Sequence, residues 1–239
     1  MPAKSSPYQP LLLRILHGLI GLSVLLAILS AYWTYETYDG RWLSLGLPDF
    51  KAIEGIHGTF GLWALLIFPA FVIYAFRRGQ QRLLQPDSFA KLTQLGRPIG
   101  WYSLHRLVNT LTILALTFAL FSGKMMDETW LPNGELNHAW YYAHLISWVV
   151  MVGCIALHVL MGAKIGGSPL LLSMVTWQVR EKDSPWLWRT HISAWWSSTQ
   201  AISLRKWLSV VVQLSDVYRV LEAIVLVSLV AAWIIPLFK

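Results

Sequence analysis

Four histidines lie inside apolar runs of this chain, where an ionisable side chain is costly and usually functional. Two of them, His144 and His158, share the run at residues 139–163, which contains no Asp, Glu, Lys or Arg. A helix places this pair on one face, with a net angular offset of about 40° and an axial separation of about 21 Å. His17 and His57 each lie one to two turns into another apolar run. The spacing predicts ligands for two cofactors stacked across a bilayer.

The number and grouping of the histidines indicate which cofactor they would bind. Zinc sites require three or four ligands that converge on one point, and di-iron membrane oxygenases require clustered histidine boxes that this sequence does not contain. Four histidines that meet in twos are instead what two six-coordinate haem b groups require, each held by two axial imidazoles without a covalent bond. The structural alternative is that each histidine is a polar residue packed and hydrogen-bonded between membrane helices.

Composition defines the class of protein. The chain has 239 residues, of which 56% are hydrophobic and 13% are charged. A soluble domain carries about 25% charged residues, so we expect an all-α integral membrane protein. The net charge of +7 is read as a topology signal and not as a nucleic-acid-binding surface. The single cysteine, Cys154, excludes a disulfide within the chain and a thioether haem attachment, and is expected to be a small packing residue.

The elements that must position the histidines follow from the apolar runs. These runs predict four membrane helices, at about residues 11–32, 53–76, 101–123 and 139–163. A shorter run at 223–238 predicts a fifth membrane helix if that helix begins near Val217. The connector at about 164–206 contains SPLLLSMVTW and LWRTHISAWW, which we expect to lie along the membrane surface. The expected units are a haem-binding bundle at 1–178 and a connector with the fifth helix at 179–239.

Charge gives the orientation. Fifteen of the nineteen lysines and arginines lie near the N-terminus, at 77–106, at 164–206 and at Arg219. The remaining loops and the C-terminus hold four basic residues and seven acidic ones. The positive-inside rule therefore places the N-terminus in the cytoplasm. The predicted inner pair is His17 with His158, and the predicted outer pair is His57 with His144.

Other residues near the predicted cofactors have weaker signals. The polar residues expected at the inner face, where they would shape a quinone pocket or bind haem propionates, are Arg14, His105, Arg106 and Asn109. The two arginines have an alternative role as positive-inside anchors. Glycines that follow His17 and His57 would let a flat macrocycle approach the backbone. Met151 is expected to fill apolar space between the cofactors, and His138 and His191 are expected to be solvated.

The ordered set of motifs resembles the prokaryotic cytochrome b561 and nickel-iron hydrogenase-type b cytochrome superfamily. The matching motifs are LRILHG ending at Gly18, GIHGTFG around His57, two histidines fourteen residues apart on the fourth helix, and SMV at 173–175. The resemblance covers about residues 8–178. One departure is Gly18, where the family often has Trp, and the Trp-rich last quarter has no counterpart that we recognise.

The resemblance implies a four-helix core with haem ligands His17, His57, His144 and His158, and with no ligand from the third helix. It implies electron exchange between a redox partner and quinone in a prokaryotic inner membrane. The partner would be a cytochrome c, a hydrogenase-like protein or another dehydrogenase subunit, and the chain would be an electron-transfer subunit more than an enzyme in its own right. One alternative is a self-contained cytochrome b561 that oxidises a small reductant such as superoxide and reduces quinone. A second is a membrane scaffold or transporter without redox chemistry.

Overall fold

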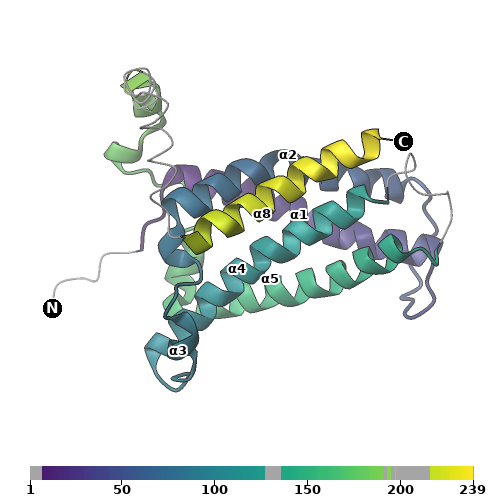
Figure 1. The fold of residues 1–239 in the computed structure, drawn as a ribbon, viewed down its shortest axis with the longest axis horizontal. Coiled ribbons are helices and arrows are strands. Elements are labelled where there is room, and N and C mark those ends of the chain that lie inside the picture. Colours follow the sequence, from purple (N-terminus) through teal and green to yellow (C-terminus); the bar gives the residue numbers. More distant parts are fainter. Residues whose placement is uncertain (1–6, 127–135, 191–192, 195–196, 198–215, 239) are drawn as a thin grey trace.

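The computed structural model describes residues 7–126, 136–190, 193–194, 197 and 216–238. In these residues the chain is helical, without strands, and five helices are long and apolar enough to cross a membrane. They are α1 (Leu11–Tyr38), α2 (Ile53–Arg78), α4 (Pro98–Lys124), α5 (Ala139–Leu172) and α8 (Asp216–Ile234), shown in Figure 1. The shorter elements are η1 (Gln80–Arg82), α3 (Ser88–Leu92), η2 (Glu181–Asp183), η3 (Pro185–Leu187) and η4 (Ile235–Leu237). The prediction of an all-α membrane fold with a fifth C-terminal helix is confirmed.

Two helices are longer than predicted. The first continues to Tyr38 because no helix-breaking residue occurs before Gly40, which adopts a φ of 60°. The fourth predicted helix, α5, continues to Leu172 and not only to residue 163, across a kink at Gly167 with a φ of 63°. The first half of SPLLLSMVTW is thus part of α5. The second predicted surface segment, LWRTHISAWW, lies partly outside the described residues, and His191 lies outside them altogether.

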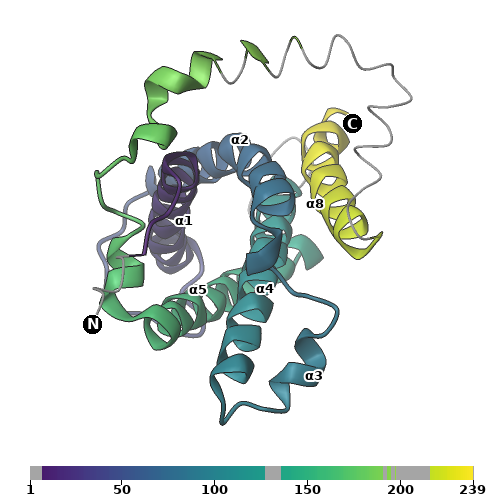
Figure 2. The same ribbon diagram turned by 90° about the vertical axis from the view of Figure 1, so that its left-hand side faces the viewer.

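The four helices of the predicted bundle enclose a common core. Viewed from one end, α1, α2, α4 and α5 follow one another around a ring, and α8 lies outside it against α2 and α4 (Figure 2). The buried core includes Val24, Leu65, Phe68, Leu116 and Met151. Met151 is 3% exposed, which agrees with its expected role as apolar filler.

Large apolar side chains also cover the outside of the bundle. Leu29, Leu66 and Val149 are each at least 60% exposed, although they lie in the middle of their helices. A water-soluble protein rarely exposes an apolar surface that continues around the whole molecule. This surface is the one that lipid chains cover.

The fifth helix is tied to the bundle by polar contacts near its N-terminal end. Arg77 Nε, at the end of α2, donates a hydrogen bond of 2.9 Å to Glu222 Oε1 on α8. The hydroxyl of Tyr218 donates to the carbonyl of Leu84, which follows η1. These contacts fix α8 against α2 and the connector. The expected division of the chain at residue 178 stays a prediction, because most of residues 191–215 lies outside the described part.

Candidate cofactor site

Two of the predicted histidines lie together at the end of the bundle that the charge distribution predicts to face outward, which we call the outer end, and the opposite end is called the inner end. His57 lies near the start of α2 and His144 near the start of α5, and their ring centroids are 5.9 Å apart. Nδ1 of His57 lies 3.0 Å from the carbonyl oxygen of Ala27 on α1. Nδ1 of His144 lies 3.1 Å from the hydroxyl of Ser122 on α4. Four helices therefore converge on this pair.

The inner end has an equivalent pair. His17 on α1 and His158 on α5 have ring centroids 5.9 Å apart, with an interplanar angle of 31°. Nδ1 of His158 lies 2.9 Å from Oδ1 of Asn109 on α4. The edge of Phe71 on α2 covers His17, at a centroid distance of 6.2 Å. His144 lies near the start of α5 and His158 near its middle, so the two pairs are separated by the spacing of these two histidines.

The hydrogen bonds fix which ring nitrogen carries the proton. A backbone carbonyl can only accept, so Nδ1 of His57 donates to Ala27. The hydroxyl of Ser122 donates to the carbonyl of Ala119, and so it accepts from Nδ1 of His144. In both rings the proton is on Nδ1, and Nε2 keeps a lone pair for a metal.

The residues present fit a planar cofactor with axial imidazoles. Imidazole–metal bonds are about 2 Å long, which places two ring centroids on opposite sides of one metal on the order of 6 Å apart. A methyl group built at Gly21 or at Gly61 meets no protein atom within 4 Å. Each of these glycines lies one turn beyond a histidine, on the same helical face. The backbone beside both histidines is therefore open to a flat ring.

A third glycine makes room for a ligand ring. A methyl group at Gly123 on α4 would lie 3.0 Å from Cε1 of His144. Gly123 follows Ser122 directly. Helix α4 therefore both accepts the hydrogen bond from Nδ1 of His144, at Ser122, and leaves space for the imidazole ring, at Gly123. Neither residue could be predicted from the sequence, because neither is spaced regularly with the histidines.

The third inner histidine lies closer to the pair than the resemblance implies. The ring of His105 on α4 is also 5.9 Å from that of His158, with an interplanar angle of 42°. His158 thus has two imidazole neighbours at the same separation. In the described residues no group of three or more metal-binding side chains converges on one point. This arrangement favours pairwise ligation over a zinc-like cluster.

The remaining polar residues predicted near the inner cofactor are held by backbone carbonyls. Arg14 is only 5% exposed and donates from Nη1 to Thr176 and from Nη2 to Gln178, across 2.9 Å for the second bond. Arg106 donates from Nε to the carbonyl of Gln81 at 2.8 Å. Both arginines therefore attach connectors to the ends of the helices by hydrogen bonds. This agrees better with their alternative role as anchors than with contacts to a cofactor.

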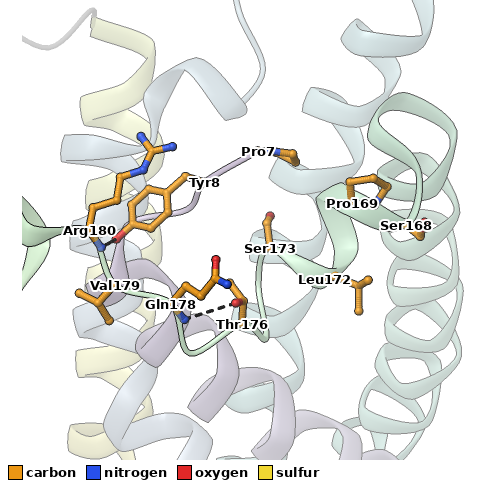
Figure 3. Close-up of a pocket in the computed structure, with 10 residues that line it drawn as sticks. All are labelled: Pro7, Tyr8, Ser168, Pro169, Leu172, Ser173, Thr176, Gln178, Val179 and Arg180. Atoms are coloured by element: carbon orange, nitrogen blue, oxygen red, sulfur yellow. Dashed lines mark hydrogen bonds between the residues drawn. The ribbon is translucent and has the colours of Figure 1, made fainter. Parts of the chain in front are cut away.

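A cavity of about 560 Å³ opens beside the N-terminal segment, near the start of α1 and the end of α5. Figure 3 shows its walls, with Tyr8 and Arg180 on one side and Pro169 and Leu172 on the other. The guanidinium of Arg180 lies 4.2 Å from the ring centroid of Tyr8. None of the four ligand candidates lines this cavity.

A network of polar contacts links the C-terminal end of α1 with the start of α5. Arg41 donates to the carboxylate of Asp39 and to the carbonyl of Leu136, and the hydroxyl of Tyr141 donates to Asp39 at 2.6 Å. Burial raises the pKa of Asp39, but the hydrogen bonds from Arg41 and Tyr141 outweigh burial and hold that pKa below its ordinary value. Arg41 also lies over the ring of Trp42. We call this network of Asp39, Arg41 and Tyr141 the outer clasp.

One loop histidine differs from its prediction. His138 is half-buried, and its Nδ1 accepts a hydrogen bond of 3.2 Å from the backbone N–H of Trp140. It therefore caps the N-terminus of α5 and is not simply solvated. A histidine is an uncommon cap, which is why the sequence did not indicate it.

The fold and the site define a multi-pass membrane protein in which four histidines form two pairs. The family of prokaryotic cytochrome b561 matches residues 8–177, and the chain belongs to that family. It is thus a membrane b-type cytochrome that takes part in electron transfer, and the family implies haem b as its cofactor. No curated protein and no solved structure matches the chain.

Proposed function

We propose that this protein passes electrons across the membrane between a redox partner at its outer surface and quinone near its inner surface. In this proposal His57 and His144 hold the outer of two haem b groups, and His17 and His158 hold the inner one. A haem whose two axial positions are filled supplies one-electron transfer and leaves no iron site for oxygen. The observation that carries the proposal is that His144 and His158, which lie on the same helix α5, each have a partner imidazole at a centroid distance of 5.9 Å.

The residues of this chain have distinct roles in the proposal. Nδ1 of His57 donates to the carbonyl of Ala27 and Nδ1 of His144 donates to the hydroxyl of Ser122, which leaves Nε2 of both rings as the nitrogen that would bind the haem iron. Gly21 and Gly61 keep the helix backbone open to the flat rings. The exposed leucines seal the outside of the bundle with lipid, which excludes water from the path between the pairs.

The orientation belongs to the same proposal. Residues 77–106 and 164–206 together hold twelve of the nineteen lysines and arginines. Helix α3, in the first range, and the described residues that follow α5 lie at the same end of the bundle (Figure 1). We assign this end to the cytoplasm by the positive-inside rule. The residues nearest to quinone would then be His105, Arg106 and Asn109 on α4, together with Arg14 on α1.

A partner protein is favoured over a small anionic reductant at the outer surface. A self-contained enzyme that oxidises superoxide needs free positive charge there to draw the anion in. Arg41 is one of the few basic residues at this end, and the outer clasp already pairs it with Asp39. Superoxide is the less favoured reductant, and the experiment compares it with protein partners.

The test uses purified, haem-loaded protein in proteoliposomes that contain quinone. Reduced quinone is expected to transfer electrons to the haems of the wild-type protein, seen as the appearance of the reduced-haem spectrum. An added oxidised cytochrome c is expected to oxidise the haems again. His158→Ala should block reduction by quinone while an outer reductant still reaches the remaining haem. Thr112→Val is a matched control on α4, because its hydroxyl bonds only to the carbonyl of Val108 in its own helix.

Two outcomes would contradict the proposal. If reduced quinone leaves the wild-type haems oxidised while dithionite reduces them, quinone is not the membrane substrate. If superoxide reduces the haems faster than any protein partner and quinone accepts the electrons, the chain is a self-contained oxidase of superoxide. A preparation without haem from haem-replete cells would instead support the scaffold or transporter alternative.

A further inference from the structure

Asn109 connects a candidate haem ligand to the connector between α2 and α4. Its Nδ2 donates to the carbonyl of Arg82 at 2.8 Å, and its Oδ1 lies 2.9 Å from Nδ1 of His158. The carbonyl of Arg82 can only accept, so the amide cannot be flipped without setting two oxygens against each other. Oδ1 must therefore face His158, and Nδ1 of His158 must be the donor.

We propose that Asn109 is a positioning residue that fixes His158 in its Nδ1–H tautomer and sets the electron-donating strength of its Nε2. The inference rests on the proposed function, in which His158 is a ligand of the inner haem. An acceptor on the outer nitrogen of a ligating imidazole fixes the ring and raises its basicity. A more basic axial ligand favours the oxidised metal and so lowers the reduction potential.

The bond to Asn109 is unlike the contacts of the other candidate ligands. His57 donates to a backbone carbonyl, which no substitution can remove directly, and His144 donates to the hydroxyl of Ser122. Of the hydrogen bonds given for these three ligand candidates in the described part of the chain, only that of His158 has a side-chain amide as its acceptor. The two ends of the molecule therefore give their ligands different basicities, and Asn109 is the position at which that difference can be altered in both directions.

The acceptor is itself held by the connector. Arg106, Asn109 and Thr110 are neighbours on one face of α4, and all three bond to the backbone of residues 81–84. The hydroxyl of Thr110 accepts from the N–H of Leu84 at 2.9 Å and donates to the carbonyl of Arg106, and in the described part of the chain no hydrogen bond joins it to a histidine. Thr110 thus shares the structural role of Asn109 without its contact to His158, which makes it a matched control.

The experiment measures the midpoint potentials of the haems by optical redox titration of purified, full-length variants. Asn109→Asp replaces the amide with a carboxylate, which loses the hydrogen bond to the carbonyl of Arg82 but is a stronger acceptor for Nδ1 of His158, and should lower the potential of one haem. Asn109→Leu removes the acceptor and should raise the potential of the same haem. The expected change is about tenfold in the equilibrium constant for reduction, or about 59 mV for one electron, in opposite directions for the two variants. Thr110→Val should leave both potentials in place.

The outcomes separate this inference from the proposed function. If His158→Ala loses one haem and the two Asn109 variants shift no potential, or shift it in the same direction, the role of Asn109 is overturned while the ligand assignment stands. If His158→Ala keeps both haems, the proposed function itself fails. A variant that only misfolds would lose haem without a signed shift of the remaining signal, so two shifts of opposite sign support positioning by Asn109.

Discussion

The imidazole rings of His57 and His144 lie beside one another at the outer end of the bundle, with their centroids 5.9 Å apart and their planes inclined at 58°. They come from helices that are far apart in the sequence, and each has its Nδ1 bonded to a third or fourth helix. This relationship joins all four helices of the bundle at one point. Substitutions near this pair should lower the haem content more than they lower the helical content.

Gly123 is the first such position. A side chain at Gly123 would meet Cε1 of His144 at 3.0 Å, so Gly123→Val should displace the ring and reduce the haem content by up to one group per chain. The matched control is Gly153→Ala on α5, where a methyl group meets no atom within 4 Å. The absorbance ratio of haem to protein measures the effect. Normal haem content in Gly123→Val would mean that His144 has more freedom than the structure indicates.

The open backbone at Gly61 allows a graded test. Gly61→Ala should be tolerated by the polypeptide because nothing lies within 4 Å of the added methyl group. Gly61→Phe should fill the space beside His57 and exclude the flat ring, with loss of haem but not of helical content. Circular dichroism and haem absorbance, recorded on the same samples, separate the two effects. Full haem loading of Gly61→Phe would show that the cofactor does not use this space.

The Arg77–Glu222 ion pair predicts how α8 is attached. Glu222 is 4% exposed, so Glu222→Leu leaves Arg77 near a buried apolar surface and should lower the free energy of unfolding by about 1–3 kcal/mol, less than for a fully buried pair because Arg77 reaches solvent. The double variant Arg77→Met, Glu222→Leu should recover much of this loss. Thermal unfolding in detergent, followed by tryptophan fluorescence, measures both. A double variant less stable than the single one would show that the pair is not coupled.

The outer clasp predicts a dependence on pH. The pKa of Asp39 is depressed in the folded protein, so its contribution to stability is present above the ordinary pKa of an aspartate and is lost as the pH falls through the lower folded value. Asp39→Asn should therefore be less stable than the wild type at pH 7 and at pH 5. The difference should disappear only in stronger acid. A difference that vanishes already between pH 7 and pH 5 would assign the effect to another group.

The sequence predicts the membrane helices because apolar length is set by the bilayer, and five of five predicted spans are present in the described residues. It also predicts which histidines share an end of the bundle, because helix direction and register follow from local rules. The rings of both predicted pairs do lie together. Their role as haem ligands stays a proposal.

Contacts between helices could not be predicted in the same way. The Nδ1 partners Ala27, Ser122 and Asn109 lie on other helices, and their meeting with the histidines depends on how the helices rotate against one another. The extension of α5 depends on a kink at Gly167 with positive φ, which composition does not indicate. The short helix α3 within the basic connector was also not predicted.

The most direct test of the account is the haem content of single-ligand variants. The wild-type protein is expected to bind two b-type haems per chain, seen in the reduced-minus-oxidised spectrum. His57→Ala and His144→Ala should each lose the same one of the two signals, and His17→Ala and His158→Ala should each lose the other, whereas His105→Ala should keep both. A wild-type protein with one haem or none, or a loss of different signals from the two members of a pair, would contradict the pairing.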